Sequence, residues 1–227
     1  FFIGSAILPR YFLNKEFKLC LAPINYVYMS FAIMTLIPAY PRYVPFYFFC
    51  VSILHLFNNA MLNKDLEYSM ILPILKKDIV KSRCLLVAVY ELICTLLSIP
   101  FSYLFTLIMP SGNDAGIEGN VAFYGLVLIL FSIFNFIFFT SYYKKAYKTG
   151  VSFVKATIAF WIIFMILEFP IWTKNVFNIP FFLMLDSTDF ACQIRQLPLL
   201  AAGIIIYFLG WLVTYKISAK RFEKVDL

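Results

Sequence analysis

Charged residues are scarce in this chain of 227 residues, at 14% of the composition. Hydrophobic residues make up 63% and aromatic residues 20%, and the mean hydropathy is +0.86. An ordinary soluble domain carries a much larger charged fraction, at about 25%. The scarcity of charge therefore excludes that class and predicts an all-α membrane protein whose apolar side chains face lipid and one another.

Residues that build catalytic or metal sites are also few. The single histidine, His55, has neither a second His nor an acid close to it in the sequence, so no catalytic or metal site is predicted. The five cysteines lack Cys-x-x-Cys spacing and fit the role of small hydrophobic residues. None of the eight glycines begins a Gly-x-x-x-x-Gly-Lys-Ser/Thr loop, so no cofactor is expected in this chain and it is not expected to hydrolyse ATP.

Six apolar stretches approach the length of about 17 to 25 residues that crosses a bilayer. Their approximate limits are 24–39, 44–62, 84–109, 121–142, 156–172 and 197–215. No soluble domain and no internal repeat interrupts them. Residues 1–227 are therefore predicted to form a single transmembrane domain.

The basic residues fix the expected orientation of these spans. All but three of the 19 Lys and Arg residues lie on one side of the six-span topology, and the exceptions are Arg42, Lys174 and Arg195. The positive-inside rule places both termini and the second and fourth loops in the cytoplasm. A net charge of +7 would suggest nucleic acid binding in a soluble protein. Here topology and contact with membrane lipid account for the charge, so no nucleic acid partner is expected.

The segment before the first span combines basic and apolar residues. Arg10, Lys15 and Lys18 fall on one helical stripe, which predicts an amphipathic helix over about 8–22 on the cytoplasmic surface. An irregular basic leader is the alternative.

The outer side carries two connections of different character. Residues 109–120 contain three Gly, one Pro and two acids, a composition typical of turns. Residues 178–185 are apolar but too short to span. They are expected to form an interfacial or re-entrant piece capped by Asp186 and Asp189, or else a solvated loop.

The second cytoplasmic loop contains more than the basic residues that set the topology. Pro73 disfavours helix at Leu72, and the residues from Lys76 to Arg83 can form a short helix that runs into the third span. Its charges stand beside apolar residues such as Ile79. A helix of this kind suits docking of another protein.

Two blocks of sequence carry a resemblance to a known family. The first is Lys64-Asp-Leu-Glu67 followed by Leu72-Pro-Ile-Leu-Lys-Lys-Asp-Ile-Val-Lys-Ser-Arg83. The second runs from Asn120-Val-Ala-Phe-Tyr-Gly125 through Phe134-Asn-Phe-Ile-Phe-Phe139 to Tyr143-Lys-Lys-Ala-Tyr-Lys-Thr-Gly150. With the six spans and the basic tail, the chain resembles the membrane permeases of type-2 ABC exporters, especially the small six-span permeases of bacterial peptide exporters of the phenol-soluble-modulin type.

The resemblance implies partners and a location. In this family the loop after the second span forms a coupling helix, here about 72–83, that docks on a separate ATPase subunit. Two permease chains assemble with two ATPase subunits, which hold ATP and Mg, in the bacterial cytoplasmic membrane. The residues then expected at the ATPase contact are Glu67, Leu72, Pro73, Ile74, Lys76, Lys77, Asp78 and Ile79.

Polar residues inside the spans are candidates for a translocation path, because an ionised group at a helix centre costs about 2.5 to 3.5 kcal/mol on insertion scales. Glu91 is expected about 10 Å into the membrane, lining a cytoplasmic cavity or pairing with a cation, or else making a structural hydrogen bond. Glu168 precedes Trp172 by one turn, so it is expected to reach water or Lys174 at the outer surface. Asn135 is expected to make a hydrogen bond between helices.

Three functions are compatible with these patterns. The first is the permease subunit of an ABC exporter that moves hydrophobic or amphipathic substrates, such as cytolytic or antimicrobial peptides, outward. The second is a substrate-capture subunit of an importer, which needs a polar pocket near the outer face. The third is an intramembrane enzyme, which needs paired acids or a His with acids. The resemblance favours the exporter.

Overall fold

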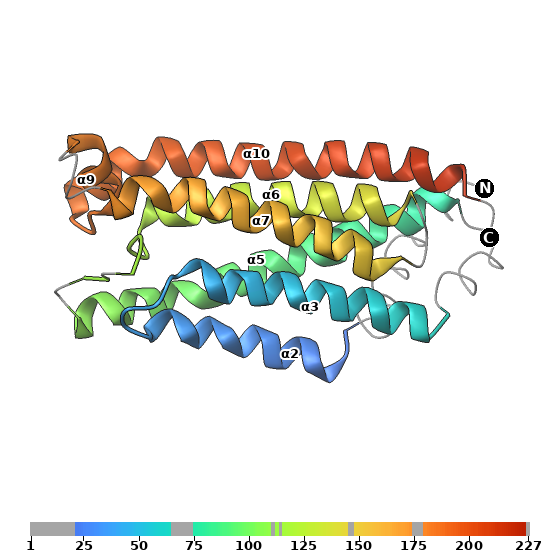
Figure 1. Ribbon diagram of the computed structural model, residues 1–227, viewed down its shortest axis with the longest axis horizontal. Coiled ribbons are helices and arrows are strands. Elements are labelled where there is room, and N and C mark those ends of the chain that lie inside the picture. The colour runs from blue at the N-terminus through green and yellow to red at the C-terminus, as the bar shows by residue number, and fades with distance from the viewer. Residues whose placement is uncertain are drawn as a thin grey trace, which may run out of the picture.

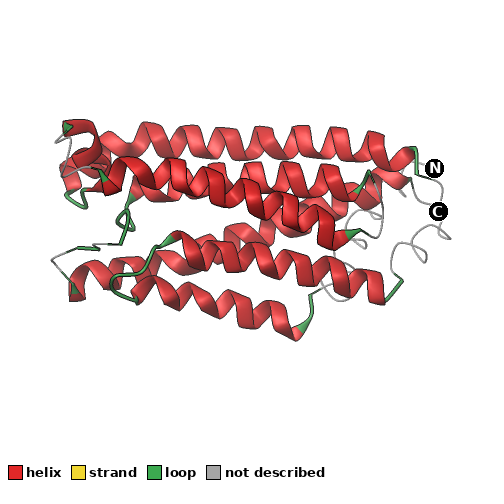
Figure 2. Ribbon diagram, in the orientation of Figure 1, coloured by secondary structure: helices red, strands yellow, loops and turns green. Residues whose placement is uncertain are grey.

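The computed structural model describes residues 21–64, 75–109, 112–113, 115–144, 148–173 and 179–225. This part of the chain is built from helices joined by short loops (Figures 1 and 2). The helices in chain order are α2 (Pro23–Ser30), the 3-10 helix η1 (Phe31–Leu36), α3 (Tyr43–Leu62), α5 (Lys76–Ile108), α6 (Val121–Tyr142), α7 (Thr149–Trp172), α9 (Pro180–Asp186) and α10 (Phe190–Glu223).

Five of these helices are long and apolar enough to cross a membrane, namely α3, α5, α6, α7 and α10. The predicted spans at 44–62 and 121–142 agree with α3 and α6. The other three helices continue about two turns past the predicted limits. Hydropathy predicts which residues lie in the hydrocarbon layer, but it does not predict where the helix itself ends. Charged residues such as Lys77 and Lys220 extend a helix readily once it has left the lipid.

The span predicted at 24–39 is not one long helix. It consists of α2 and η1, so five of the six predicted spans have a long helix and the sixth is not confirmed. With rises of about 1.5 and 2.0 Å per residue, α2 and η1 together extend about 24 Å. The Asn25 side chain accepts the backbone N–H of Ala22 at 2.9 Å where α2 begins. Pro38 follows the end of η1 and cannot donate the backbone hydrogen bond that would continue the helix.

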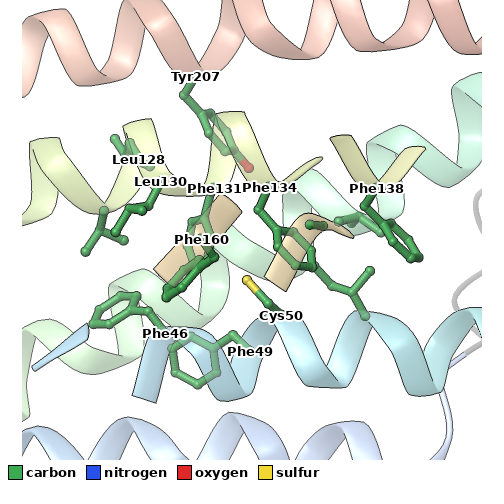
Figure 3. Packing of buried hydrophobic residues seen from close by; sticks show 14 of the residues in the cluster. Phe46, Phe49, Cys50, Leu128, Leu130, Phe131, Phe134, Phe138, Phe160 and Tyr207 are labelled. Carbon is green, nitrogen blue, oxygen red and sulfur yellow. The ribbon is translucent and has the colours of Figure 1, made fainter. Parts of the chain in front are cut away.

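Aromatic rings form a large part of the core between α3, α6 and α7 (Figure 3). Phe46 meets Phe123 edge to face, with ring centroids 5.4 Å apart and an interplanar angle of 77°. Phe46 meets Phe49 in the same way, at 5.4 Å and 75°. Such pairs contribute about 0.5 to 1.5 kcal/mol each beyond the area they bury. Much of the high aromatic content therefore holds the bundle together.

Helices α6 and α10 run parallel and touch backbone to backbone (Figure 1). A Cβ atom on Gly203 would lie 2.3 Å from the carbonyl oxygen of Gly125, and one on Gly125 would lie 2.8 Å from the carbonyl oxygen of Leu199. Farther along, Ser132 donates to the carbonyl of Ile206 at 3.2 Å. Small residues permit such close contact in membrane helices. We call this contact the glycine seam.

The two ends of the bundle differ in their polar groups. At one end Lys76 Nζ donates to the carbonyl of Val225 at 2.8 Å, which brings the start of α5 beside the end of α10. Figure 1 shows α9 at the opposite end, where α6 and α10 begin. That end carries Arg42 and the segment 112–120. Most basic residues of α10, including Lys220, lie at the first end, whereas Arg195 lies near the start of α10.

Candidate functional site

A carboxylate in the middle of the bundle accepts hydrogen bonds on both oxygens. Asn135 Nδ2 donates to Oε1 and Oε2 of Glu91, each at 2.9 Å, and the Tyr207 hydroxyl donates to Oε2 at 2.8 Å. These residues come from α6, α10 and α5, and all three are buried. The predicted hydrogen bond of Asn135 between helices is confirmed. We call the three residues the Glu91 cluster.

The surroundings of Glu91 differ from the cation or water-filled cavity that the sequence suggested. Glu91 is 0% exposed, and its partners among the described residues are neutral donors. It lies about 22 Å along α5 from Lys76, near the middle of the helix. Arg83 is about 12 Å farther back along α5, with its guanidinium 5.4 Å from the centre of the Phe57 ring. The amide and phenol donors are closer, so the alternative of a structural hydrogen bond describes this state.

A second polar network lies one residue away on α5. The Tyr90 hydroxyl donates to Ser52 Oγ at 2.6 Å, and Asn25 Nδ2 donates to the Ser52 carbonyl at 2.9 Å. The network connects α2, α3 and α5. Sequence reasoning missed these residues, although an isolated polar residue in an apolar run signals that a buried partner is needed.

Metal ligands are not gathered at either network. No group of three or more His, Cys, Asp or Glu residues within the described ranges could hold a metal ion. Nε2 of His55 lies 3.2 Å from the hydroxyl of Tyr28, and the two rings stack with centroids 5.4 Å apart.

The end of the bundle that carries α9 contains a buried ion pair. Arg42 Nη2 lies 2.8 Å from Glu118 Oε2, and the two side chains are 2% and 8% exposed. Arg42 also donates to the carbonyl of Thr35 at 3.1 Å, and its guanidinium lies 4.2 Å from the centre of the Phe105 ring. Burial lowers the pKa of Arg42, and the neighbouring Glu118 carboxylate opposes that shift. The pair fixes the segment 112–120 to the start of α3.

Glu168 is buried, which corrects the expectation that it reaches water at the outer surface. It is 0% exposed, and its carboxylate accepts the backbone N–H of Ile117 at 3.1 Å. A Cβ on Gly116 would lie 2.6 Å from Glu168 Oε1, so a side chain at this position would displace the carboxylate. Trp172 Nε1 donates to the carbonyl of Ala115 at 3.2 Å. The C-terminal end of α7 thus binds the backbone at Ala115 and Ile117, which is why Glu168 faces protein.

Helix α9 adds further contacts at the same end of the bundle. It is a helix of seven residues within the apolar piece predicted near 178–185, and the interfacial or re-entrant position of that piece stays a prediction. Asp186 Oδ1 accepts the backbone N–H of Glu118 at 2.9 Å. Gln196 of α10 accepts the backbone N–H of Ala122 at 3.1 Å and donates to the carbonyl of Met184 at 2.7 Å. We call Arg42, Glu118, Glu168, Asp186 and Gln196, with their partners, the outer lock.

The predicted ATPase contact is described only from residue 75 onward. Leu75, Lys77 and Asp78 are exposed at the start of α5, and Lys76 is partly buried by its bond to Val225. The predicted short helix that runs into the third span is the first part of α5. Glu67, Leu72, Pro73 and Ile74 lie outside the described residues, as does most of the predicted helix at 8–22.

Ile79 does not lie on the surface where a partner would dock. It is 1% exposed and belongs to the hydrophobic core. The periodicity of the long helix α5 explains this, because Ile79, Arg83 and Leu86 recur at helical spacing and all face the bundle. The contact proposed below therefore uses the exposed residues of this turn.

A family model described as ABC-2 family transporter protein matches residues 7–222. The chain belongs to this family. As an ABC-2 permease it is a multi-pass, non-catalytic transmembrane subunit of a transporter, and ABC-2 permeases pair with ABC ATPase subunits. No curated protein and no solved structure gives a significant match.

Proposed function

We propose that this ABC-2 permease exports hydrophobic or amphipathic substrates, in particular cytolytic or antimicrobial peptides, powered by a separate ATPase subunit. The single observation that carries the direction is the outer lock. Its buried acids and amides bind one another and the backbone, as in the 2.8 Å pair of Arg42 and Glu118. A subunit that captures a substrate from outside would instead hold polar groups available for it at this end.

The end of the bundle where α5 begins and α10 ends offers a place for the ATPase. Leu75, Lys77 and Asp78 are exposed on the first turn of α5, beside the end of α10. We propose that the coupling helix at 72–83 docks on the ATPase there through its exposed residues and not through Ile79, with Glu67 close to the contact. Helix α5 runs unbroken from Lys76 through Glu91 to Ile108. A push on its first turn would therefore move the Glu91 cluster.

In this proposal the candidate translocation-path residues Glu91, Asn135 and Glu168 hold the helices together in the closed state. Glu91 and Asn135 join α5 to α6, and Glu168 joins α7 to the segment before α6. In the state described here these bonds hold the bundle shut. Export requires the Glu91 bonds to break as α5 moves away from α6, and the Glu168 bonds to break as α7 moves away from the segment before α6. The two acids then face the passing substrate.

The assembly and orientation follow the family resemblance and the charge pattern. We propose that two permease chains assemble with two ATPase subunits, which bind ATP and Mg. The end that carries Lys77 and Lys220 faces the cytoplasm of a bacterial cell, with both termini on that side.

The test uses the permease co-expressed with its ATPase and reconstituted in proteoliposomes. Charge reversal at Lys77→Glu with Asp78→Lys leaves the buried face of α5 unchanged. We expect the double variant to lose ATPase stimulation and ATP-dependent uptake of a labelled cationic amphipathic peptide into inside-out vesicles. Lys155→Glu is the matched control, since Lys155 is exposed near the start of α7 at the same end of the bundle.

Two outcomes would contradict the proposal. Unchanged stimulation and uptake in the double variant would reject the docking site at the start of α5. Uptake that proceeds only into right-side-out vesicles, with ATP supplied inside, would make the protein an importer. A hydrophilic peptide of equal length tests the substrate class, and we expect no uptake of it.

A further inference from the structure

Helix α10 changes character along one exposed face. Leu209 and Val213 are 55% and 46% exposed and lie on the outside of the bundle. Lys216, Lys220 and Lys224 continue the same face at intervals of four residues, and all three are exposed. This side of α10 is thus apolar at Leu209 and Val213, inside the predicted span, and cationic from Lys216 onward, beyond the end of the span. We call these five residues the α10 stripe.

The cationic part of the stripe surrounds a hollow. Lys216, Ile217, Lys220, Arg221 and Lys224 line a shallow cavity of about 300 Å³. Arg221 is held in place because its guanidinium donates to the carbonyl of Thr140 on α6. The four cations of this cavity outnumber the single acid of the same turn, Glu223, so the hollow favours an anion.

We propose that the α10 stripe binds one anionic phospholipid. Its phosphate lies in the hollow between Lys216, Lys220 and Lys224, and an acyl chain follows Val213 and Leu209 into the membrane. Each ammonium group supplies up to three donors for phosphate oxygens. Each basic residue close to an anionic membrane surface strengthens binding by about fivefold.

The continuity of the stripe favours a lipid over the other anions that could reach it. A free phosphate would use only the hollow. An acidic patch on a soluble partner would meet the lysines but could not follow Val213 and Leu209 into the span. A phospholipid matches both parts at once. The proposal concerns a lipid contact outside the bundle, so it stands apart from the direction of transport and the identity of the exported substrate.

The test is native mass spectrometry of the full chain in detergent with equal amounts of long-chain phosphatidylglycerol and phosphatidylcholine. We expect the wild type to retain phosphatidylglycerol preferentially. Lys220→Gln should reduce that preference by about fivefold, and the triple change Lys216→Gln, Lys220→Gln and Lys224→Gln should remove it. Lys155→Gln, at an exposed site on α7, is the control and should keep it.

Further measurements separate a lipid from other ligands. The double variant Val213→Ser with Leu209→Ser should retain less phosphatidylglycerol than the wild type. Inorganic phosphate at millimolar concentration should not displace phosphatidylglycerol from the wild type. Equal retention of both lipids by the wild type, or full preference in the triple variant, would overturn the proposal. So would displacement by inorganic phosphate, which indicates a free-anion site. Loss of ATPase copurification with unchanged lipid preference would assign the lysines to the protein partner. Thermal melting of each variant verifies that it is folded.

Discussion

Removing the charge of Glu118 is the most direct test of the outer lock. Glu118→Gln keeps the shape of the side chain and an oxygen that accepts from Arg42, but it removes the negative charge. Arg42 is only 2% exposed, so its cation cannot turn to water once the partner is neutral. The carbonyl of Thr35 and the Phe105 ring remain beside it and compensate in part.

The expected magnitude follows from that burial. Two unit charges about 4 Å apart interact by about 4 kcal/mol at an effective dielectric constant of about 20. Breaking a buried pair by removing one partner costs about 3 to 5 kcal/mol. We expect Glu118→Gln to lower the free energy of unfolding by an amount near the lower end of that range. The double variant Arg42→Met with Glu118→Leu should cost much less than the sum of the single changes, since it leaves no buried charge.

The assay is unfolding of the purified permease in mixed micelles by increasing fractions of sodium dodecyl sulfate, followed by circular dichroism. Arg195→Met is the matched control, because Arg195 is an exposed cation near the start of α10 and its loss should change stability by less than about 0.5 kcal/mol. A cost below about 1 kcal/mol for Glu118→Gln would refute the reasoning. Additive costs in the double variant would refute it as well.

Two further predictions concern the interior of the bundle. Glu91→Gln should fold normally because the amide still accepts a hydrogen bond. Glu91→Leu leaves the Asn135 amide without this acceptor, while the Tyr207 hydroxyl keeps the Ala88 carbonyl at 3.2 Å, so we expect a cost of about 1 to 3 kcal/mol in the same unfolding assay. Equal stability of the two variants would contradict the structural role. Gly203→Ala should lower the free energy of unfolding strongly, because its Cβ would lie 2.3 Å from the Gly125 carbonyl oxygen. Gly150→Ala, with open space around it, should be neutral. A small effect of Gly203→Ala on stability would mean that the two helices are farther apart than described.

The helices were predictable where apolar runs end at polar residues. The run of α6 begins after Asn120, whose side chain accepts the backbone N–H of Phe123 at 2.9 Å, and the predicted and observed limits of this helix agree. The first span was harder to predict. Hydropathy records an apolar segment over 24–39, but it does not record that the backbone changes from α2 to the tighter η1 before Pro38.

The candidate site was predictable residue by residue but not as a set of contacts. Glu91 and Asn135 stand out as polar residues in apolar runs, and they form a pair. Arg42 and Glu118 are 76 positions apart, so no local pattern links them. Ile79 was interpreted from the few residues around it as part of a docking face. The full length of α5 instead sets which of its sides is buried.

The glycine seam limits which movements this bundle can make. A slide of α10 along α6 would drive the backbone at Gly203 into the side chains next to Gly125 on α6, because Gly203 and Gly125 have no side chain that separates the two helices there. The register of α6 against α10 is therefore fixed. If α5 moves away from α6 and α10, Glu91 separates from Asn135 and from Tyr207 together. The amide and the phenol hydrogen bonds of the Glu91 cluster then break in a single step.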